Sequence, residues 1–174
     1  MKSLVVYSSR TGNTEKVARA IYAALPQPAD IHCVDDCPDP SKYDFVALGF
    51  WVDRGAPDAK AQEYMRSVQG KAIGLFGTLG AWPDSEHAKD CVRKAEELVQ
   101  GNQVLGSFLC QGRIDPRIIE AMQKAVANTH PMTPERKARI QEAEKHPDEQ
   151  DLQAAQDAFR GMLEAFVPES LCVS

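Results

Sequence analysis

The first 110 residues alternate short apolar runs, typical of buried strands, with stretches in which apolar residues recur at helical spacing. Such a pattern predicts an α/β protein with a parallel sheet covered by helices on both faces. The second predicted strand is the weakest of the five. The five strands are Leu4–Tyr7, Asp30–Val34, Asp44–Phe50, Lys71–Phe76 and Val104–Cys110.

The predicted helices are placed by their apolar stripes and capping residues. The first ends at Pro26, and Asp84 is expected to cap the helix that follows the fourth strand. One connection is unusually short for a parallel arrangement. The link from the second to the third strand has only about eight residues, whereas a parallel crossover usually needs a dozen or more.

The last third of the chain is predicted to be helical, with helices beginning near Asp115, Thr133 and Asp148. The helix after Thr133 is nearly all polar, which is typical of a solvated helix. The helix after Asp115 should face inward through Ile118, Ile119, Met122 and Val126. We expect one domain over residues 1–174, with a helical extension at 113–147 and a final packing helix at 148–167.

Composition narrows the function classes. Hydrophobic residues make up 43% and charged residues 26%, as in soluble globular proteins. The apolar runs are far shorter than the roughly 20 residues of a membrane span, and the N-terminus lacks the apolar core of a secretory signal. A net charge of −5 disfavours a nucleic-acid binder. Five cysteines without a CxxC pair favour reduced structural thiols in a cytoplasmic protein, without a metal site.

The segment Ser9–Thr14 joins the first strand to the first helix and carries candidate chemistry. A helix start offers unpaired N–H groups and the positive end of its dipole, so it attracts anions. Ser9, Thr11, Asn13 and Thr14 add hydroxyl and amide donors, and Gly12 lets the backbone approach closely. The loop lacks the lysine of a Walker loop and the glycine triplet of a dinucleotide site. It suits a monoester phosphate, with plain helix capping as the alternative.

The stretch Val5–Thr14, followed by Ala18 and Ile21, resembles the flavodoxin phosphate-loop signature at every fixed position. The resemblance implies a flavodoxin-like three-layer αβα sandwich with a five-stranded parallel sheet of order 2-1-3-4-5 and extra C-terminal helices. It implies FMN at the carboxyl ends of the strands, with its phosphate in the loop from Ser9 through Arg10 to Thr14. In this family a short segment also carries the chain from the second strand to the third.

Four further segments resemble flavodoxin-family proteins grouped with the accessory flavodoxin of bacterial bilirubin reduction. They are Gly49–Gly55, Phe76–His87, Cys110–Gly112 and His146–Glu149. The resemblance implies an electron-transfer protein with a separate electron donor and a partner reductase, which could act on a linear tetrapyrrole. The acidic net charge suits a basic partner face. The alternative is an FMN-dependent NAD(P)H:quinone-type oxidoreductase, which would need a pocket for nicotinamide above the flavin. No catalytic residue is assigned.

Two loops, after the third and fourth strands, are expected to hold the flavin ring. They carry the only two tryptophans, whose flat faces suit stacking, with plain packing as the alternative. Arg54 would stabilise the negative charge of a reduced ring, or else face solvent paired with Asp53 or Asp58. Flavodoxins usually have an acidic residue and a tyrosine in the second loop, where this chain has Gly80 and Trp82. The candidate ring contacts are Trp51, Val52, Asp53, Arg54, Gly55, Thr78, Leu79, Gly80 and Trp82.

Overall fold

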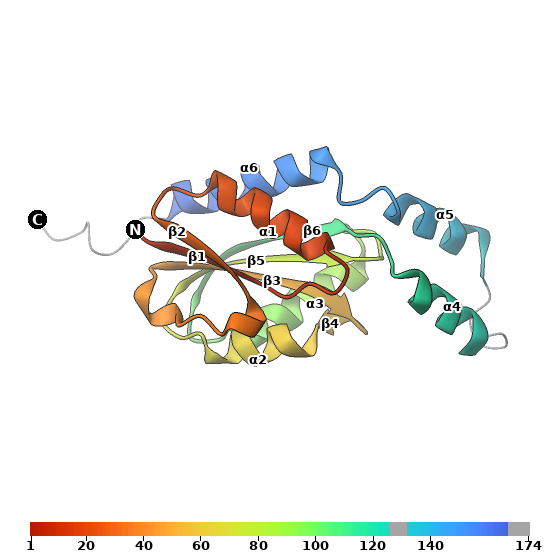
Figure 1. The fold of residues 1–174 in the computed structure, drawn as a ribbon, viewed down its shortest axis with the longest axis horizontal. Coiled ribbons are helices and arrows are strands. Elements are labelled where there is room, and N and C mark those ends of the chain that lie inside the picture. The colour runs from red at the N-terminus through yellow and green to blue at the C-terminus, as the bar shows by residue number, and fades with distance from the viewer. Residues whose placement is uncertain (126–131, 167–174) are drawn as a thin grey trace, which may run out of the picture.

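The computed structural model describes residues 1–125 and 132–166 and shows a parallel sheet between two layers of helices (Figure 1). Its five parallel strands stand in the order β2-β1-β3-β5-β6, which confirms the expected flavodoxin-like order. A short sixth strand, β4, pairs antiparallel with the end of β3. The strands are β1 (Ser3–Tyr7), β2 (Ala29–Cys33), β3 (Phe45–Asp53), β4 (Ala56–Pro57), β5 (Ala72–Leu79) and β6 (Gln103–Gln111).

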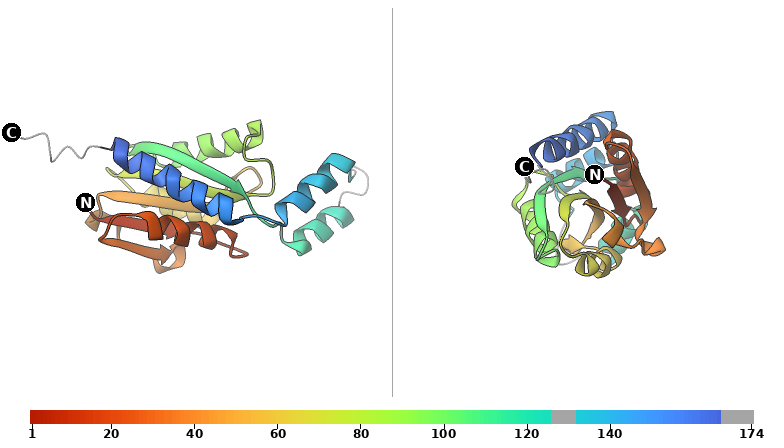
Figure 2. Two further views of the ribbon diagram at one scale, coloured as in Figure 1. Left: turned by 90° about the horizontal axis from the view of Figure 1, so that it is seen from above. Right: turned by 90° about the vertical axis from the view of Figure 1, so that its left-hand side faces the viewer.

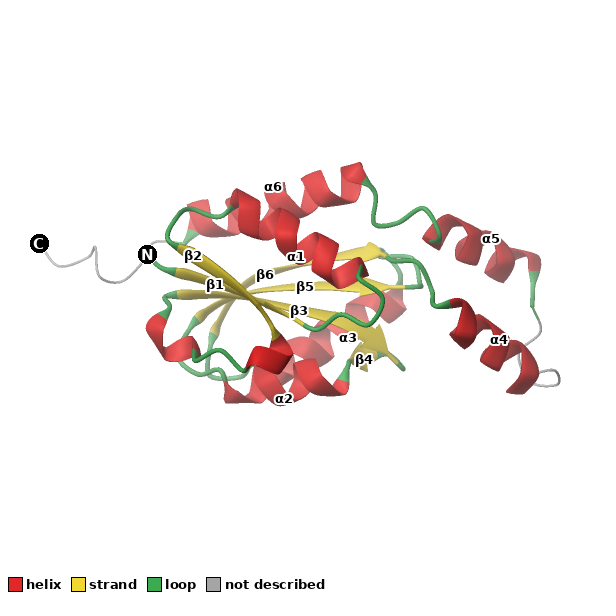
Figure 3. Ribbon diagram, in the orientation of Figure 1, coloured by secondary structure: helices red, strands yellow, loops and turns green. Residues whose placement is uncertain are grey.

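The helices form two layers and one projection (Figures 2 and 3). Helices α1 (Asn13–Ala24) and α6 (Glu149–Ala165) pack on one face of the sheet, and α2 (Ala59–Ser67) and α3 (Glu86–Leu98) pack on the other. The link from β2 to β3 contains two single 3₁₀ turns at Val34–Asp36 and Pro40–Lys42 instead of a helix. Helices α4 (Pro116–Ala125) and α5 (Pro134–Ala143) lie between β6 and α6.

The core on the α1 and α6 face is built around Phe159. Its ring meets Phe45 and Phe76 edge to face, with centroids 6.2 Å and 5.9 Å apart. A Cβ on Gly74 would lie 2.6 Å from the Phe159 ring, so the absence of a side chain there lets α6 approach the middle of the sheet. This contact fixes the final helix across the strands that lead to the candidate site.

Two local predictions need correction. The N-cap of α3 is Ser85, whose hydroxyl accepts from Ala88 N, and not Asp84. The short strand β4 was not predicted, because its two residues are too few to form a pattern. The inward side chain expected at Val126 lies outside the described residues, and the structure describes only the backbone at Met122.

The loops after β1, β3, β5 and β6 meet where the parallel strands end, and α4 and α5 project beyond this carboxyl edge (Figures 1 and 2). The chain segments that lead into and out of this projection, its two stems, are in contact. Arg113 N in the first donates a hydrogen bond to His146 O in the second at 3.0 Å. In open α/β sheets, ligands bind at the carboxyl edge where the strand order reverses, here between β1 and β3. No helix in the described part of the chain is long and apolar enough to cross a membrane.

Candidate cofactor site

The loop between β1 and α1 forms an open anion cradle. Gly12 is the N-cap of α1 with φ 89°, a left-handed conformation that glycine adopts without strain. Since glycine has no side chain, the N-cap residue makes no side-chain hydrogen bond, and within the described residues the N–H groups of Asn13 and Thr14 remain available to a ligand. Ser9 Oγ holds the curve of the loop by accepting from Gly12 N at 3.1 Å and from Glu15 N at 3.3 Å.

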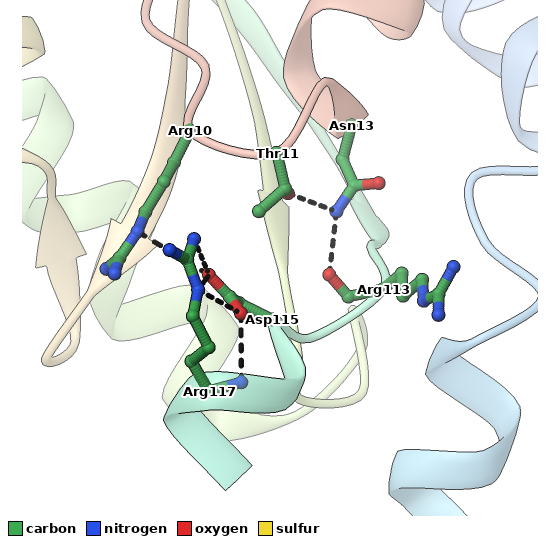
Figure 4. Close-up of polar contacts among 6 residues, drawn as sticks. All are labelled: Arg10, Thr11, Asn13, Arg113, Asp115 and Arg117. Atoms are coloured by element: carbon green, nitrogen blue, oxygen red, sulfur yellow. Dashed lines mark hydrogen bonds and ion pairs between the residues drawn. The ribbon is translucent and has the colours of Figure 1, made fainter. Parts of the chain in front are cut away.

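Two side-chain contacts tie this loop to neighbouring strands. The hydroxyls of Thr14 and Thr78 lie 2.8 Å apart in a buried hydrogen bond, which joins the start of α1 to the end of β5. Asn13 Nδ2 donates to Thr11 Oγ1 at 3.2 Å and to Arg113 O at 2.9 Å (Figure 4). A Cβ on Gly112 would lie 2.8 Å from Asn13 Nδ2, so a larger residue there would displace the asparagine.

The loop after β3 is a hairpin. Arg54 and Gly55 both have positive φ, 49° and 79°, and form the two-residue turn between Asp53 and its strand partner Ala56. Lys94 Nζ of α3 donates to Gly55 O at 2.8 Å, which holds the turn against the helix that follows the second ring-side loop. The first of the two loops expected to flank a flavin is therefore hydrogen-bonded to the helix that follows the second.

A buried carboxylate supports the base of the hairpin. Asp58 is 3% exposed, and its Oδ1 accepts from Ser8 Oγ at 2.7 Å and from Ala61 N at 3.3 Å. The aspartate thus caps α2 and connects it to the residue that precedes the phosphate loop. Its Oδ2 has no hydrogen-bond partner among the described residues, and neither has the buried amide nitrogen of Gln111 at the end of β6.

Arg10 crosses the site from the phosphate loop (Figure 4). Its guanidinium lies 5.6 Å from the centre of the Trp51 ring and 4.0 Å from Asp115 Oδ2. Arg117 also bonds this carboxylate, at 2.8 Å from Nη2 and 2.9 Å from its backbone N. These hydrogen bonds from Arg117 lower the pKa of Asp115 to about 2.

A model of the flavodoxin domain family matches residues 4–160. The chain belongs to the flavodoxin family. Membership in this family confirms the expected type of fold and FMN as the cofactor. This flavodoxin is similar to two curated proteins, both called flavodoxin-like domain-containing protein BilS. One, from Clostridioides difficile, is 35% identical over 94% of this chain and 97% of its own length. The other, from Clostridium symbiosum, is 28% identical over 90% and 93%.

Solved structures show the same fold at low identity. Oxidised Flavodoxin 2 from Bacillus cereus has a TM-score of 0.61 at 17% identity, covering 95% of this chain and 100% of that chain. A flavoprotein in complex with FMN from Lactobacillus acidophilus has a TM-score of 0.51 at 17% identity, covering 69% and 97%. The first of these matches nearly the full length of this flavodoxin.

The residues of the loop Ser9–Thr14 lie together at the start of α1, whereas the candidate ring-side residues are spread over two loops. Thr78 joins the phosphate loop through Thr14, and Trp51 lies under Arg10. Trp82 is 45% exposed, and Gly80 packs closely under Ile114. Within the described residues Arg54 forms no ion pair, so the suggested pairing with Asp53 or Asp58 is absent. The roles of these residues toward a ring stay predictions.

Sequence reasoning missed Arg113, Asp115 and Arg117 as neighbours of the site. Asp115 was recognised only as a helix start, which is one of its functions. Its second contact, with Arg10, joins residues 105 positions apart, and no local pattern marks such a pair. The Asn13 contact with Arg113 O likewise depends on where the β6 loop ends in space.

One group of possible metal ligands lies at the foot of α6. Single ligand atoms of His146, Asp148 and Asp151 lie within 4.8 Å of one another. All three already have partners, since Asp148 caps α6 and Asp151 Oδ2 lies 2.5 Å from His146 Nδ1. The arrangement serves as a helix cap that fastens the return of the chain from α5 to α6.

The low pKa of Asp115 makes a pH prediction possible. A carboxylate whose pKa is lower in the folded state adds stability above its unfolded pKa, near 4, and loses that contribution as the pH falls toward 2. Arg117→Met removes the main cause of the shift, so Asp115 should accept a proton at a higher pH. We expect the midpoint of acid unfolding, followed by circular dichroism, to move upward.

The matched control is Arg160→Met, which removes a surface pair with Asp157 at 2.8 Å. Exposed pairs of this kind contribute little, so the control midpoint should stay near that of the parent protein. Equal midpoints for Arg117→Met and Arg160→Met would show that the Asp115 contact does not stabilise the fold at low pH.

Proposed function

We propose that this flavodoxin carries single electrons from a donor to a separate reductase, with its FMN phosphate in the Ser9–Thr14 loop. The observation that supports this most is the start of α1 at Gly12, where the N-cap has no side chain and neutral donors line the loop. A dianionic monoester phosphate is satisfied there by hydroxyl, amide and backbone N–H groups together with the helix dipole. Bound FMN supplies reversible one-electron chemistry.

Each part of the site has a distinct task in this proposal. Ser9 keeps the loop curved, and Thr14, fixed by Thr78, directs its hydroxyl toward the phosphate. The hairpin tip, held by Lys94, gives the ring a rigid wall. A rigid wall suits an electron carrier, because a site that changes little between redox states needs little reorganisation.

The cofactor assignment is tested on the purified protein. We expect the released flavin to be FMN by mass spectrometry at one equivalent per chain, and FAD or no flavin would reject the phosphate-loop assignment. NADPH alone should not bleach the flavin absorbance, whereas photoreduction should. Rapid bleaching by NADPH alone, with turnover of an added quinone, would favour the oxidoreductase alternative.

We propose further that the electron acceptor belongs to a system that reduces a linear tetrapyrrole such as bilirubin. The similarity to the BilS proteins extends over more than nine tenths of the chain, which supports this choice. The test mixes the photoreduced protein with a purified bilirubin reductase and bilirubin under anaerobic conditions. Loss of bilirubin absorbance that requires both proteins supports the proposal, and loss without this protein contradicts it.

A further inference from the structure

Three arginines come from two distant segments that meet at the phosphate-loop corner of the site. Arg10 comes from the loop after β1, while Arg113 and Arg117 come from the loop and helix after β6 (Figure 4). Among the described residues, the only carboxylate that Arg10 and Arg117 contact is Asp115, whose side chain is 5% exposed, against 46% for Arg10 and 80% for Arg117. Two cations therefore lie beside one buried anion, and the exposed side chain of Arg113 points away from them on the same loop (Figure 4).

Positive and negative residues are unevenly distributed along the chain, and the positive excess falls in the segment that contains Arg113 and Arg117. Residues 113–145 contain seven Lys and Arg against five Asp and Glu. The rest of the chain contains thirteen Lys and Arg against twenty Asp and Glu. The segment that projects past the carboxyl edge is thus positive, although the whole chain carries −5. At physiological salt the Debye length is about 8 Å, so a docked partner senses nearby charges far more than the net charge.

The position of this corner makes it available to a partner protein. Asn13 fastens the β6 loop to the phosphate loop through Arg113 O. Helices α4 and α5 extend outward from this point (Figure 1). A protein that docks at this corner of the carboxyl edge therefore meets the arginines. The loops after β3 and β5 differ, because they carry exposed Asp53 and Asp84 against a single Arg54.

We propose that Arg10, Arg113 and Arg117 form a basic docking rim for an acidic surface on the redox partner. This inference rests on the proposed electron-transfer function and reverses the expectation of a basic partner drawn from net charge. Guanidinium groups suit the task, because they bind carboxylates through paired hydrogen bonds. Complementary charge raises the rate of encounter and fixes the orientation of the complex.

Arg113 allows a clean test, because its guanidinium has no hydrogen bond or ion pair in the described structure and only its backbone is engaged. Arg113→Glu therefore inverts one rim charge without breaking a side-chain contact within the described residues. The matched control is Arg66→Glu, near the end of α2 at the opposite edge of the sheet, where Arg66 contacts only Gln62.

The photoreduced holoprotein is mixed in a stopped-flow instrument with an oxidised acceptor, either acidic rubredoxin or basic cytochrome c. In each reaction the flavin loses one electron and the ferric iron of the acceptor becomes ferrous. We expect the rate with rubredoxin to fall as salt increases, and Arg113→Glu to lower the low-salt rate by roughly fivefold or more. Arg66→Glu should change it less than about twofold.

The outcomes separate the two proposals. If neither acceptor is reduced, or the protein holds no FMN, the proposed function fails. If transfer occurs but salt slows only the reaction with cytochrome c, or Arg113→Glu behaves like Arg66→Glu, the function stands and the basic rim is rejected. A fluorescence titration with FMN should give Arg113→Glu the affinity of the parent, and a weakened affinity would assign Arg113 to the cofactor instead.

Discussion

Replacing Thr14 by alanine is expected to raise the Kd for FMN by roughly tenfold to a hundredfold. The hydroxyls of Thr14 and Thr78 lie 2.8 Å apart, and either can donate. When Thr78 donates, the Thr14 proton is available to a phosphate oxygen. A hydrogen bond to a charged group contributes about 1.5–3 kcal/mol, and each 1.4 kcal/mol is about tenfold in Kd. The buried hydroxyl of Thr78 also loses its partner in this variant. Titration of apoprotein with FMN measures the change.

Thr133→Ala is the matched control for Thr14→Ala. Thr133 is also a threonine at a helix start, where its hydroxyl accepts from Arg136 N at the beginning of α5. The control should lose some stability, about 1 kcal/mol for a helix cap, with no change in FMN affinity. If Thr14→Ala binds FMN like the parent, the phosphate lies elsewhere and the proposed orientation of the cofactor is wrong.

Replacing Phe159 by alanine is expected to lower the free energy of unfolding by about 3–5 kcal/mol. The ring is completely buried between Phe45, Phe76 and the bare backbone of Gly74, so its removal leaves a cavity that rigid strands cannot close. A domain of this size is stabilised by about 5–15 kcal/mol in total. The variant should therefore be close to unfolding at physiological temperature.

Urea unfolding followed by circular dichroism tests the Phe159 prediction. Phe108→Ala is the control, because Phe108 packs against the same core from the edge strand β6 but is only partly buried. We expect it to lose clearly less stability than Phe159→Ala. Saturating FMN should raise both midpoints by linkage, since only the folded chain forms the site. Equal losses from the two variants would mean that α6 does not depend on Phe159.

Patterning was sufficient to predict the parallel strands and the loop Ser9–Thr14 between β1 and α1, and the resemblance to flavodoxins supplied the strand order. Strands such as β3 and β5 are buried on both faces, so their apolar runs are continuous and easy to recognise. The loop Ser9–Thr14 was equally clear, because its chemistry is contained in consecutive residues. Local sequence also placed the cap of α6 at Asp148.

Contacts between distant segments could not be predicted in the same way. The ion pair of Arg10 with Asp115 depends on the order β1-β3-β5-β6, and the cover of Trp51 by Arg10 depends on the path of a single side chain. The hairpin at Arg54 and Gly55 lacked the usual Asn-Gly or Asp-Gly signal, so its turn was not recognised. Electrostatics followed the same rule, since the net charge of the chain did not reveal a positive corner.

The contact between Arg113 N and His146 O has a consequence for how this family can diversify. The chain leaves the body after β6 and returns at nearly the same point, so the intervening residues form a closed excursion. Lengthening such an excursion costs little, about 0.6 kcal/mol for each doubling of a flexible loop. Insertions and deletions between these stems can accumulate without shifting the register of β6 or the seat of Phe159. A different binding segment could therefore be inserted between Arg113 and His146 while the rest of the fold is kept.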